Sequence, residues 1–435
     1  MPSLFVKERI FWIAILWFIV ENRRVAKPVH DYPMNRKHVL AWVLYDFANS
    51  VYPGVVTATI FSVYFTSTIV GNEEGLGDLW WGRMLSISLL FVALSSPLLG
   101  SVSDRAGARK KMLFFYTYLC VFSVALFVTI KPGMIFWGLA LAFLANVGFE
   151  GALVFYNAYL PELAPPNRQG FISGLGSSVG YAGSVAGLLI ALPLVNREDL
   201  DPIWLSVAIF FAIFSLPSFL LLPSDRVSSE TLKESVVEIT KRFTSILNEV
   251  LRQRELRRFL LAFFFYIDGI LTTIYFAAIF ADTTLGFEKQ ELIYLFLVVQ
   301  IAAFVGALSL SKATDIWGPK KIINVTLIMW TAVLIAVYFV ESKTDFLVLS
   351  ILAGSGLGAV QAASRSLMSS LIPPGKEAEM FGFYAFCGKS SSILGPLVFG
   401  QVSFYMGGNQ RVAILSVVAF LLIGLTLLQR VKVVK

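Results

Sequence analysis

Twelve long apolar stretches run along this chain and leave little sequence for anything else. They cover about residues 39–70, 84–101, 112–130, 133–160, 171–195, 203–223, 258–282, 290–313, 322–340, 346–371, 380–406 and 411–430. A helix needs about 20 mostly apolar residues to cross a bilayer, so each stretch predicts one membrane-spanning helix. Continuous apolar runs also exclude a membrane β-barrel, whose strands are short and alternate between apolar and polar residues.

The composition gives the same answer. Hydrophobic residues make up 57% of the chain and charged residues only 14%, whereas a soluble domain carries about 25% charged residues. We therefore expect an all-α membrane protein whose main contact is the lipid bilayer.

The net charge of +7 raises the question of nucleic-acid binding, but membrane topology explains it better. If the N-terminus is cytoplasmic, most of the 35 Lys and Arg residues fall in segments on the cytoplasmic side. Such an asymmetry orients a membrane protein. It predicts that both termini are cytoplasmic and that no nucleic acid is bound.

Two basic loops of similar sequence follow the second and the eighth apolar stretch. An aspartate, a glycine and two basic residues recur at one constant offset, and a later set of glycines also recurs in the second half. The first loop contains Gly100, Asp104, Arg105, Gly107 and Arg109, and the second contains Asp315, Gly318 and Lys320. Two similar halves of six helices are typical of a transporter that works by alternating access.

The apolar stretches divide the chain into four parts. Residues 34–223 form an N-terminal six-helix half, 224–257 a cytoplasmic amphipathic linker, and 258–435 a C-terminal six-helix half. Residues 1–33 form an extension whose apolar run is too short to cross a membrane. Two interpretations of this extension stay open, an interfacial helix or a start codon assigned too early, with Met34 as the true start.

Charged residues inside the apolar stretches are the first candidates for function, because charge is costly within a bilayer. They are Asp46, Glu150, Asp268, Arg365 and Lys389, on helices 1, 4, 7, 10 and 11. Helices 1, 4, 7 and 10 are equivalent if each half consists of two three-helix repeats, and they would then line one central cavity. The alternative is that some of these residues lie near helix ends and reach water; for Glu150, in the middle of its helix, that alternative is weak.

Neighbouring polar residues support a polar cavity. Asn49, Asn157 and Gln361 lie on the same helix faces as the charged residues, at spacings of one or two turns. Glu150 has two possible roles. It exchanges a proton during transport, because burial favours the neutral form of an unpaired carboxylate, or it pairs with Arg365 or Lys389 and stays ionised. Asp78, beside Glu73 and Glu74, is expected in an external loop.

The sequence predicts neither an enzyme nor a resident cofactor. Both histidines precede the first helix and the two cysteines lie in apolar helices, so no metal site is expected. The phosphate-binding loop of ATP-driven transporters is absent from the sequence. Uphill transport would therefore need coupling to protons or another ion.

The basic loop from Gly100 to Lys111 resembles the signature loop between helices 2 and 3 of the major facilitator superfamily, with Ala108 in place of a usual basic residue. Residues 315–321 resemble its weaker copy. The resemblance implies the major facilitator fold. It also implies that Asp104 and Arg105 brace the two halves in one conformation.

A narrower resemblance covers most of the chain from about residue 38. The segments WVLYDFANS (42–50), YNAYLPEL (156–163) and FGFYAFCGK (381–389), together with residues 364–367 and 372–375, are similar to the vacuole-effluxer-like branch of that superfamily. Fungal members of the branch release amino acids from the vacuole. The resemblance therefore implies transport of a small molecule, with amino acids as the substrate it suggests.

We interpret the chain as a secondary transporter for a small polar metabolite, located as a multi-pass protein in a prokaryotic inner membrane. Two alternatives stay open at this point. The first is a transporter of lipids or hydrophobic drugs on the same fold. The second is a receptor or scaffold that transports nothing. The sequence leaves the substrate, the direction of transport, the coupling ion and the oligomeric state undetermined.

Overall fold

The structure is a computed structural model, and it describes residues 35–106, 108–164, 166–196, 199–223, 241, 244–245, 247–372 and 377–432. Within these ranges, the side chains of residues 96–106, 161, 166–171, 307–313, 315, 377–379 and 382 are not described. Residues 36–435 form one compact unit. The extension 1–33 lies outside the described residues, as does most of the predicted linker, of which residues 247–252 are helical.

The N-terminal half is entirely helical in the part that the structure describes. Its first spanning segment joins α2 (Arg36–Asn49), η2 (Pro53–Thr57), α3 (Ile60–Val63) and η3 (Tyr64–Val70), and it is followed by α4 (Leu76–Ala106), α5 (Arg109–Ala125), η4 (Leu126–Thr129), α6 (Ile135–Asn157), α7 (Leu160–Leu163), α8 (Pro166–Ala191) and α9 (Asp201–Leu221). Helix α2 packs on α8 and α9, and α6 packs on α4 and α5.

The C-terminal half repeats this pattern. It consists of α11 (Arg254–Leu285), α12 (Lys289–Trp317), α13 (Pro319–Phe339), α14 (Lys343–Leu371), α15 (Glu377–Ser391), α16 (Leu394–Tyr405) and α17 (Gln410–Gln429). Helix α14 packs on α12 and α13, and α17 packs on α11, α13 and α16. Among the described residues, eleven helices are long and apolar enough to cross a membrane. Helices α15 and α16 together form one further spanning segment, which is the eleventh in chain order.

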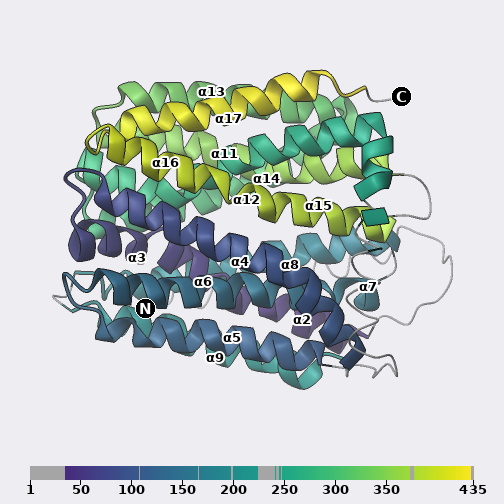
Figure 1. The fold of residues 1–435 in the computed structure, drawn as a ribbon, viewed down its shortest axis with the longest axis horizontal. Coiled ribbons are helices and arrows are strands. Elements are labelled where there is room, and N and C mark those ends of the chain that lie inside the picture. Colours follow the sequence, from purple (N-terminus) through teal and green to yellow (C-terminus); the bar gives the residue numbers. More distant parts are fainter. Residues whose placement is uncertain are drawn as a thin grey trace, which may run out of the picture. The chain divides into compact units, whose positions relative to one another are not determined.

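The two halves meet along a few helices only. Helix α4 packs against α15 and α16, α8 packs against α12, and α3 packs against α11. In Figure 1 the teal and purple helices of the N-terminal half lie beside the green and yellow helices of the C-terminal half, with α4 and α8 at the boundary. This is the two-half arrangement that the sequence repeats predict.

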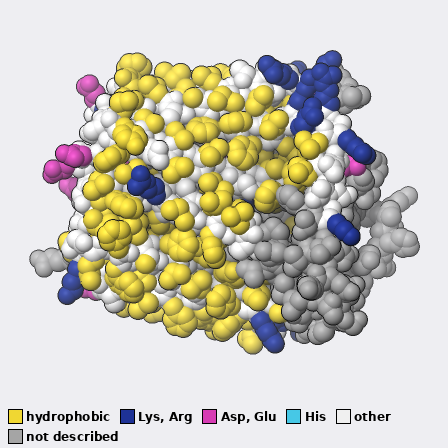
Figure 2. Space-filling view, in the orientation of Figure 1, with side chains coloured by type: hydrophobic (Ala, Val, Ile, Leu, Met, Phe, Trp, Pro, Cys, Tyr) yellow, Lys and Arg dark blue, Asp and Glu magenta, His cyan; other side chains and the backbone are white. Residues whose placement is uncertain are grey.

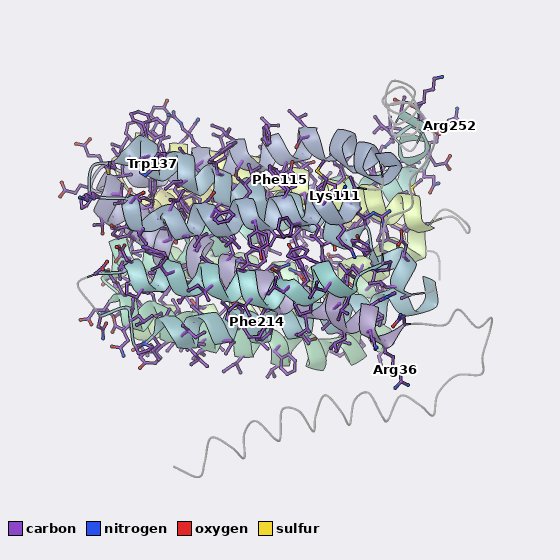
Figure 3. All side chains as sticks on the ribbon, turned by 90° about the horizontal axis from the view of Figure 1, so that it is seen from below. Arg36, Lys111, Phe115, Trp137, Phe214 and Arg252 are labelled. Carbon is purple, nitrogen blue, oxygen red and sulfur yellow. The ribbon has the colours of Figure 1, made fainter. Side chains whose placement is uncertain are left out.

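The outside of the bundle is apolar, as a lipid-facing surface must be. Phe115, Trp137 and Phe214 are 57%, 43% and 40% exposed, and Figure 3 shows these labelled side chains on the outer faces of their helices. Figure 2 shows a broad hydrophobic band, with most Lys and Arg side chains toward one end and most Asp and Glu toward the other. We call the end that holds residues 71–75, 340–342 and 406–409 the outer end, because the basic residues predict the opposite end to be cytoplasmic.

The first spanning segment is irregular where it borders the centre of the protein. Pro53 lacks a backbone N–H, and the N–H of Ala58 bonds the Pro53 carbonyl at 3.0 Å, five residues back instead of four. This wider turn, of the π type, changes the direction of the side chains that follow. Thr57, the last residue of η2, is buried and its hydroxyl donates to the Pro53 carbonyl.

The eleventh spanning segment, expected as one helix over 380–406, is divided in two. Helix α15 ends at Ser391 and α16 begins at Leu394. Discontinuous membrane helices expose backbone groups at the break, and these need partners within the protein. The carboxylate of Asp268 supplies one, since its Oδ1 accepts the N–H of Gly395 at 3.0 Å.

The expectation that Asp78 lies in an external loop is wrong. Helix α4 begins at Leu76, well before the apolar stretch at residue 84, so Asp78 lies in its first turn. The side chain is fully buried. Polarity in the sequence indicated exposure here, but contacts from the other half of the protein cover this carboxylate.

The orientation in the membrane is tested by two single cysteines in a variant that lacks Cys120 and Cys387. Ser245 and Glu341 are exposed and lie at opposite ends of the bundle. We expect an impermeant thiol reagent added outside intact cells to label Glu341→Cys, and to label Ser245→Cys only after the cells are opened, because basic segments stay in the cytoplasm. Labelling of both from the same side would contradict the topology.

Candidate functional site

A cavity of about 520 Å³ lies between the two halves. The N-terminal half contributes α2, η2, α6 and α8 to its wall, and the C-terminal half contributes α11, α12, α13, α14, α16 and α17. Its volume falls in the range of about 300–1,000 Å³ that is usual for small-molecule sites. A central position between two repeats is where secondary transporters bind their substrates.

The N-terminal wall of the cavity is polar. Asp46, Asn49 and Ser50 line it from α2, at the three- and four-residue spacing that places side chains on one helix face. From α8 the polar residues that line it are Ser177, Tyr181 and Ser184. Asn49 is only 3% exposed, and in the described part of the chain its amide nitrogen has no hydrogen-bond partner. The side chains of Asn49 and Tyr156 are nevertheless near enough to Asp46 to stabilise its carboxylate, so this wall presents carboxylate, amide and hydroxyl groups to a ligand.

Glycines on α8 allow α2 to approach closely at this wall. A Cβ atom added at Gly176 would lie 2.6 Å from Asp46 Oδ2, and one at Gly180 would lie 2.8 Å from Ser50 Oγ. A Cβ atom at Gly183 would collide with the backbone carbonyl of Phe47. These glycines of α8 thus bring the Asp46 carboxylate directly against the α8 backbone.

The C-terminal wall is apolar and rich in aromatic rings. Phe276 and Phe399 stack with ring centroids 4.1 Å apart, and both line the cavity. Further rings that line it are Phe280, Phe296, Trp330 and Phe346. Polar exceptions are Thr273, Gln300, Ser350 and Gln361. The Gln300 Nε2 atom donates to Ser184 Oγ across the two halves at 2.9 Å.

Glu150 and Lys389 form an ion pair that joins the two halves. Lys389 Nζ lies 2.8 Å from Glu150 Oε2, and the side chains are 29% and 13% exposed. The same ammonium group donates to the backbone carbonyl of Glu150 at 3.2 Å. Of the two partners considered for Glu150, the structure therefore selects Lys389. Lys389 also lies in the last turn of α15, where a positive charge is favoured by the helix dipole.

Asp46 and Arg365 are not neutralised in this way. Neither forms an ion pair in the part of the chain that the structure describes. Arg365 Nη1 donates to the hydroxyl of Ser173 on α8 at 3.4 Å, and Arg365 is not among the residues that line the cavity. The Asp46 carboxylate of α2 lies against Gly176, which is also on α8. Asp46 and Arg365 therefore contact positions of α8 that are one turn apart.

Asp268 lies behind the cavity wall and does not line it. It is fully buried. Its Oδ1 atom accepts from Gly395 N and, at 3.5 Å, from Thr272 Oγ1. Its Oδ2 atom has no hydrogen-bond partner among the described residues. A fully buried carboxylate with one unsatisfied oxygen is costly in its ionised form.

The other candidate residue predicted on α6, Asn157, does not line the cavity. Asn157 is the last residue of α6 and is exposed. It is therefore separate from the cavity, although its spacing from Glu150 placed both on one helix face. Asn146, on the same face, donates to Ser88 Oγ at 2.7 Å within its own half.

The basic loops are described in part. Gly107 and the side chains of Asp104, Arg105 and Asp315 lie outside the described residues, as does any contact that Gly100 makes, so the proposed brace stays a prediction. Arg109 Nη1 forms an ion pair with Glu162 Oε1 at 2.6 Å. Gly318 ends α12 with φ +85°, a conformation that glycine adopts without strain.

Two lysines of these loops bind equivalent places in the two halves. Lys110 Nζ donates to the carbonyl of Leu222, just after the end of α9, at 2.5 Å. Lys320 Nζ donates to the carbonyls of Gln429 and Val431, at the end of α17, at 3.1 and 2.7 Å. Each lysine thus satisfies carbonyls that the last helix of its own half leaves unpaired. The sequence repeat did not indicate this role.

The sequence interpretation also missed residues that line the cavity. Gln300 carried a signal, since it is an amide in the middle of an apolar stretch, and intramembrane polar residues are functional candidates. Phe276, Phe296 and Trp330 carried none, because aromatic residues are common on lipid-facing and buried helix faces alike.

Comparison with known proteins agrees with this geometry. The fold is that of the major facilitator transporters: a D-xylose–proton symporter of known structure superposes with a TM-score of 0.68 at 15% identity, over 89% of this chain and 97% of that one. The family model described as "Vacuole effluxer Atg22 like" matches residues 83–435. The chain belongs to this family of transporters.

Two relatives illustrate the breadth of the family. An uncharacterized MFS-type transporter, YxiO of Bacillus subtilis, is 30% identical over 403 residues, which cover 89% of this chain and 93% of the relative. Autophagy-related protein 22 of the yeast Vanderwaltozyma polyspora is 24% identical, over 83% of this chain and 76% of the relative.

The ion pair between the halves gives a stability prediction. We expect Glu150→Gln to lower the free energy of unfolding by about 1.5–3 kcal/mol, the usual value of a hydrogen bond to a charged group, because Lys389 loses its counter-charge. The double variant Glu150→Gln with Lys389→Met should recover most of the loss. Thermal unfolding in detergent measures both. Equal melting of the parent and Glu150→Gln would show that the pair contributes nothing.

Proposed function

We propose that the protein is an alternating-access secondary transporter for small zwitterions, with amino acids that carry apolar side chains as the preferred substrates. One observation carries the proposal. Asp46 and Arg365 have no ion-pair partner in the described part of the chain, whereas Glu150 and Lys389 neutralise each other.

The two unpaired charges match the two charges of an amino acid. A lone charge within the bilayer costs roughly 2.5–3.5 kcal/mol on insertion scales. An ammonium group at Asp46 and a carboxylate group at Arg365 would offset both costs. Gly176, next to Asp46, and Ser173, next to Arg365, lie on α8 about 4.5 Å apart along the helix axis, a spacing suited to one small molecule.

The rest of the cavity suits an apolar side chain. Aromatic rings of the C-terminal half form the opposite wall, and burial of apolar surface there contributes about 25 cal/mol per Å². A strongly polar or acidic side chain would lose hydration at this wall without gaining hydrogen bonds. The shape and chemistry therefore favour substrates such as leucine over glutamate.

The relatives support the same class of substrate. The family description names vacuolar efflux, and the fungal relatives are autophagy-related proteins. The Bacillus relative supports a bacterial cell membrane as the location of this chain. We therefore propose export of the metabolite as the direction of transport.

We further propose that transport is coupled to an ion, with protons as the first candidate. Asp268 supports this assignment, because its buried Oδ2 atom lacks a partner in the described structure, and protonation removes the cost of an ionised group there. Thr273, Ile274, Phe276 and Ala277 follow it on α11 and line the cavity, so substrate binding and the state of Asp268 are connected through one helix.

The aromatic wall also favours a second candidate, a transporter of hydrophobic compounds. Such compounds use the rings of the C-terminal half and need neither Asp46 nor Arg365. The two candidates therefore differ in how transport depends on these two charges.

Counterflow in proteoliposomes tests the proposal. Vesicles loaded with unlabelled leucine should accumulate labelled leucine, and glutamate should compete weakly. We expect Asp46→Asn to raise the KM for leucine about 10- to 100-fold, because it weakens a hydrogen bond between charged groups. The matched control Glu73→Gln changes an exposed acid at the outer end and should leave transport unchanged.

Substrate analogues assign each charge. 4-Methylpentanoate lacks the ammonium group of leucine. In the parent protein it should therefore compete poorly with labelled leucine for transport. In Asp46→Asn it should compete nearly as well as unlabelled leucine does. Isopentylamine lacks the carboxylate and should show the same relation with Arg365→Gln. Transport of hydrophobic cations that is insensitive to both substitutions would favour the second candidate instead.

A further inference from the structure

A buried carboxylate at the outer end of the bundle belongs to neither the cavity nor the central ion pair. Asp78 is fully buried and accepts side-chain hydrogen bonds from Asn72 Nδ2 at 2.9 Å, Ser403 Oγ at 2.5 Å and Gln410 Nε2 at 2.9 and 3.0 Å. Both of its oxygens are therefore satisfied. No basic residue of the described structure pairs with it.

These hydrogen bonds connect the two halves of the protein. Asp78 is in the first turn of α4 in the N-terminal half, whereas Ser403 is on α16 and Gln410 begins α17 in the C-terminal half. Asn72 belongs to the same half as Asp78, and its Oδ1 atom accepts the backbone N–H of Asp78 at 3.0 Å. Asn72 thus fixes the carboxylate in place, and Ser403 and Gln410 bring the other half to it.

The backbones of the two halves also touch at this point. A Cβ atom added at Gly400 on α16 would lie 2.5 Å from the Asp78 carbonyl oxygen. A Cβ atom at Gly82 would collide with the Pro396 carbonyl, and one at Gly408 would lie 2.8 Å from the Glu73 carbonyl. Glycines therefore permit α4 and α16 to close on each other, and closure brings Ser403 to the carboxylate.

A second contact of the same kind lies nearby. Ser67 Oγ, at the end of the first spanning segment, donates to Asp282 Oδ2 on α11 at 2.6 Å. At the outer end, a carboxylate of each half thus accepts hydrogen bonds from neutral donors of the other. Asp78 is the more buried of the two and has more partners.

We infer that Asp78 is a positioning residue for alternating access, which holds the outer end of the two halves together through Ser403 and Gln410. Its donors are neutral side chains, and water can replace them when the halves separate. An ion pair with a basic residue would be harder to part in a low dielectric. The contact therefore stabilises the closed outer end without preventing it from opening.

Asp78→Asn tests this inference because it changes the hydrogen-bonding pattern at constant size. The new amide group would place an NH₂ donor against the Gln410 donor, so closure loses at least one hydrogen bond. We expect the ratio of outer-open to outer-closed protein to rise about 10-fold. Ser403→Ala removes a single donor and should shift the ratio in the same direction by less.

Gly400→Ala gives the same test by steric means and leaves the carboxylate intact. Its methyl group would push α16 away from the Asp78 carbonyl, so it should also favour the open outer end. The matched control is Gly174→Ala on α8, where an added Cβ meets no atom within 4 Å and no shift is expected. The matched control for Asp78→Asn is Glu73→Gln, which changes an exposed acid at the same end of the bundle.

The measurement is the rate at which an impermeant thiol reagent, added outside the cell, labels Ser350→Cys in a variant without Cys120 and Cys387. Ser350 lines the cavity on α14, so labelling reports an open path from outside. This readout needs no transported substrate, and a failure of the proposed substrate leaves it unaffected.

We expect about 10-fold faster labelling in Asp78→Asn and a smaller increase in Ser403→Ala and Gly400→Ala. Melting temperature is measured alongside to separate stability from conformation. Lower stability with an unchanged labelling rate would assign Asp78 a purely structural role and overturn the inference. If Asp78→Asn fails to fold, unchanged labelling in both Ser403→Ala and Gly400→Ala overturns it equally.

Discussion

The arrangement of the two halves depends on how charged side chains that are removed from water find partners. Within the bilayer no solvent compensates an ionised group, so every charged side chain must find a partner, lose its charge or wait for a ligand. Glu150 and Lys389 have found each other across the two halves. Asp78 is surrounded by neutral donors. Asp46 and Arg365 have only neutral hydrogen-bond partners and no counter-charge in the described structure, and the proposal that they bind the two ends of a substrate rests on this difference.

Much of the fold followed from periodic apolar composition and from repeats. The thickness of the bilayer dictates the length of each spanning segment, and that constraint acts on the sequence locally. The break between α15 and α16 was not foreseen, although Gly395 and Pro396 follow it and Pro396 has no N–H to donate to the carbonyl of Ser392. Asp268 on a distant helix stabilises the break through Gly395, and contacts between distant segments leave no local pattern.

The site was predictable to a lesser degree. Charged residues in apolar stretches were the residues to examine, but spacing on a helix face did not show which of them meet. Asn157 shared a face with Glu150 and lies away from the cavity. Asp78 looked like a loop residue and is buried by the other half. In each case the outcome depends on how two six-helix units pack, which hydrophobic periodicity does not encode.

The lysines at the ends of α9 and α17 have a mechanical consequence. Lys110 and Lys320 each tie the third helix of a half to the end of its sixth, so that each half resists bending. Stiff bodies that rock about a central contact behave as levers. A contact near the pivot of such bodies parts over a short path, whereas a contact at the rim travels much farther for the same rotation. Hydrogen bonds are short-ranged, so under the proposed rocking motion the network around Asp78 at the rim would break early and would set when the rotation begins.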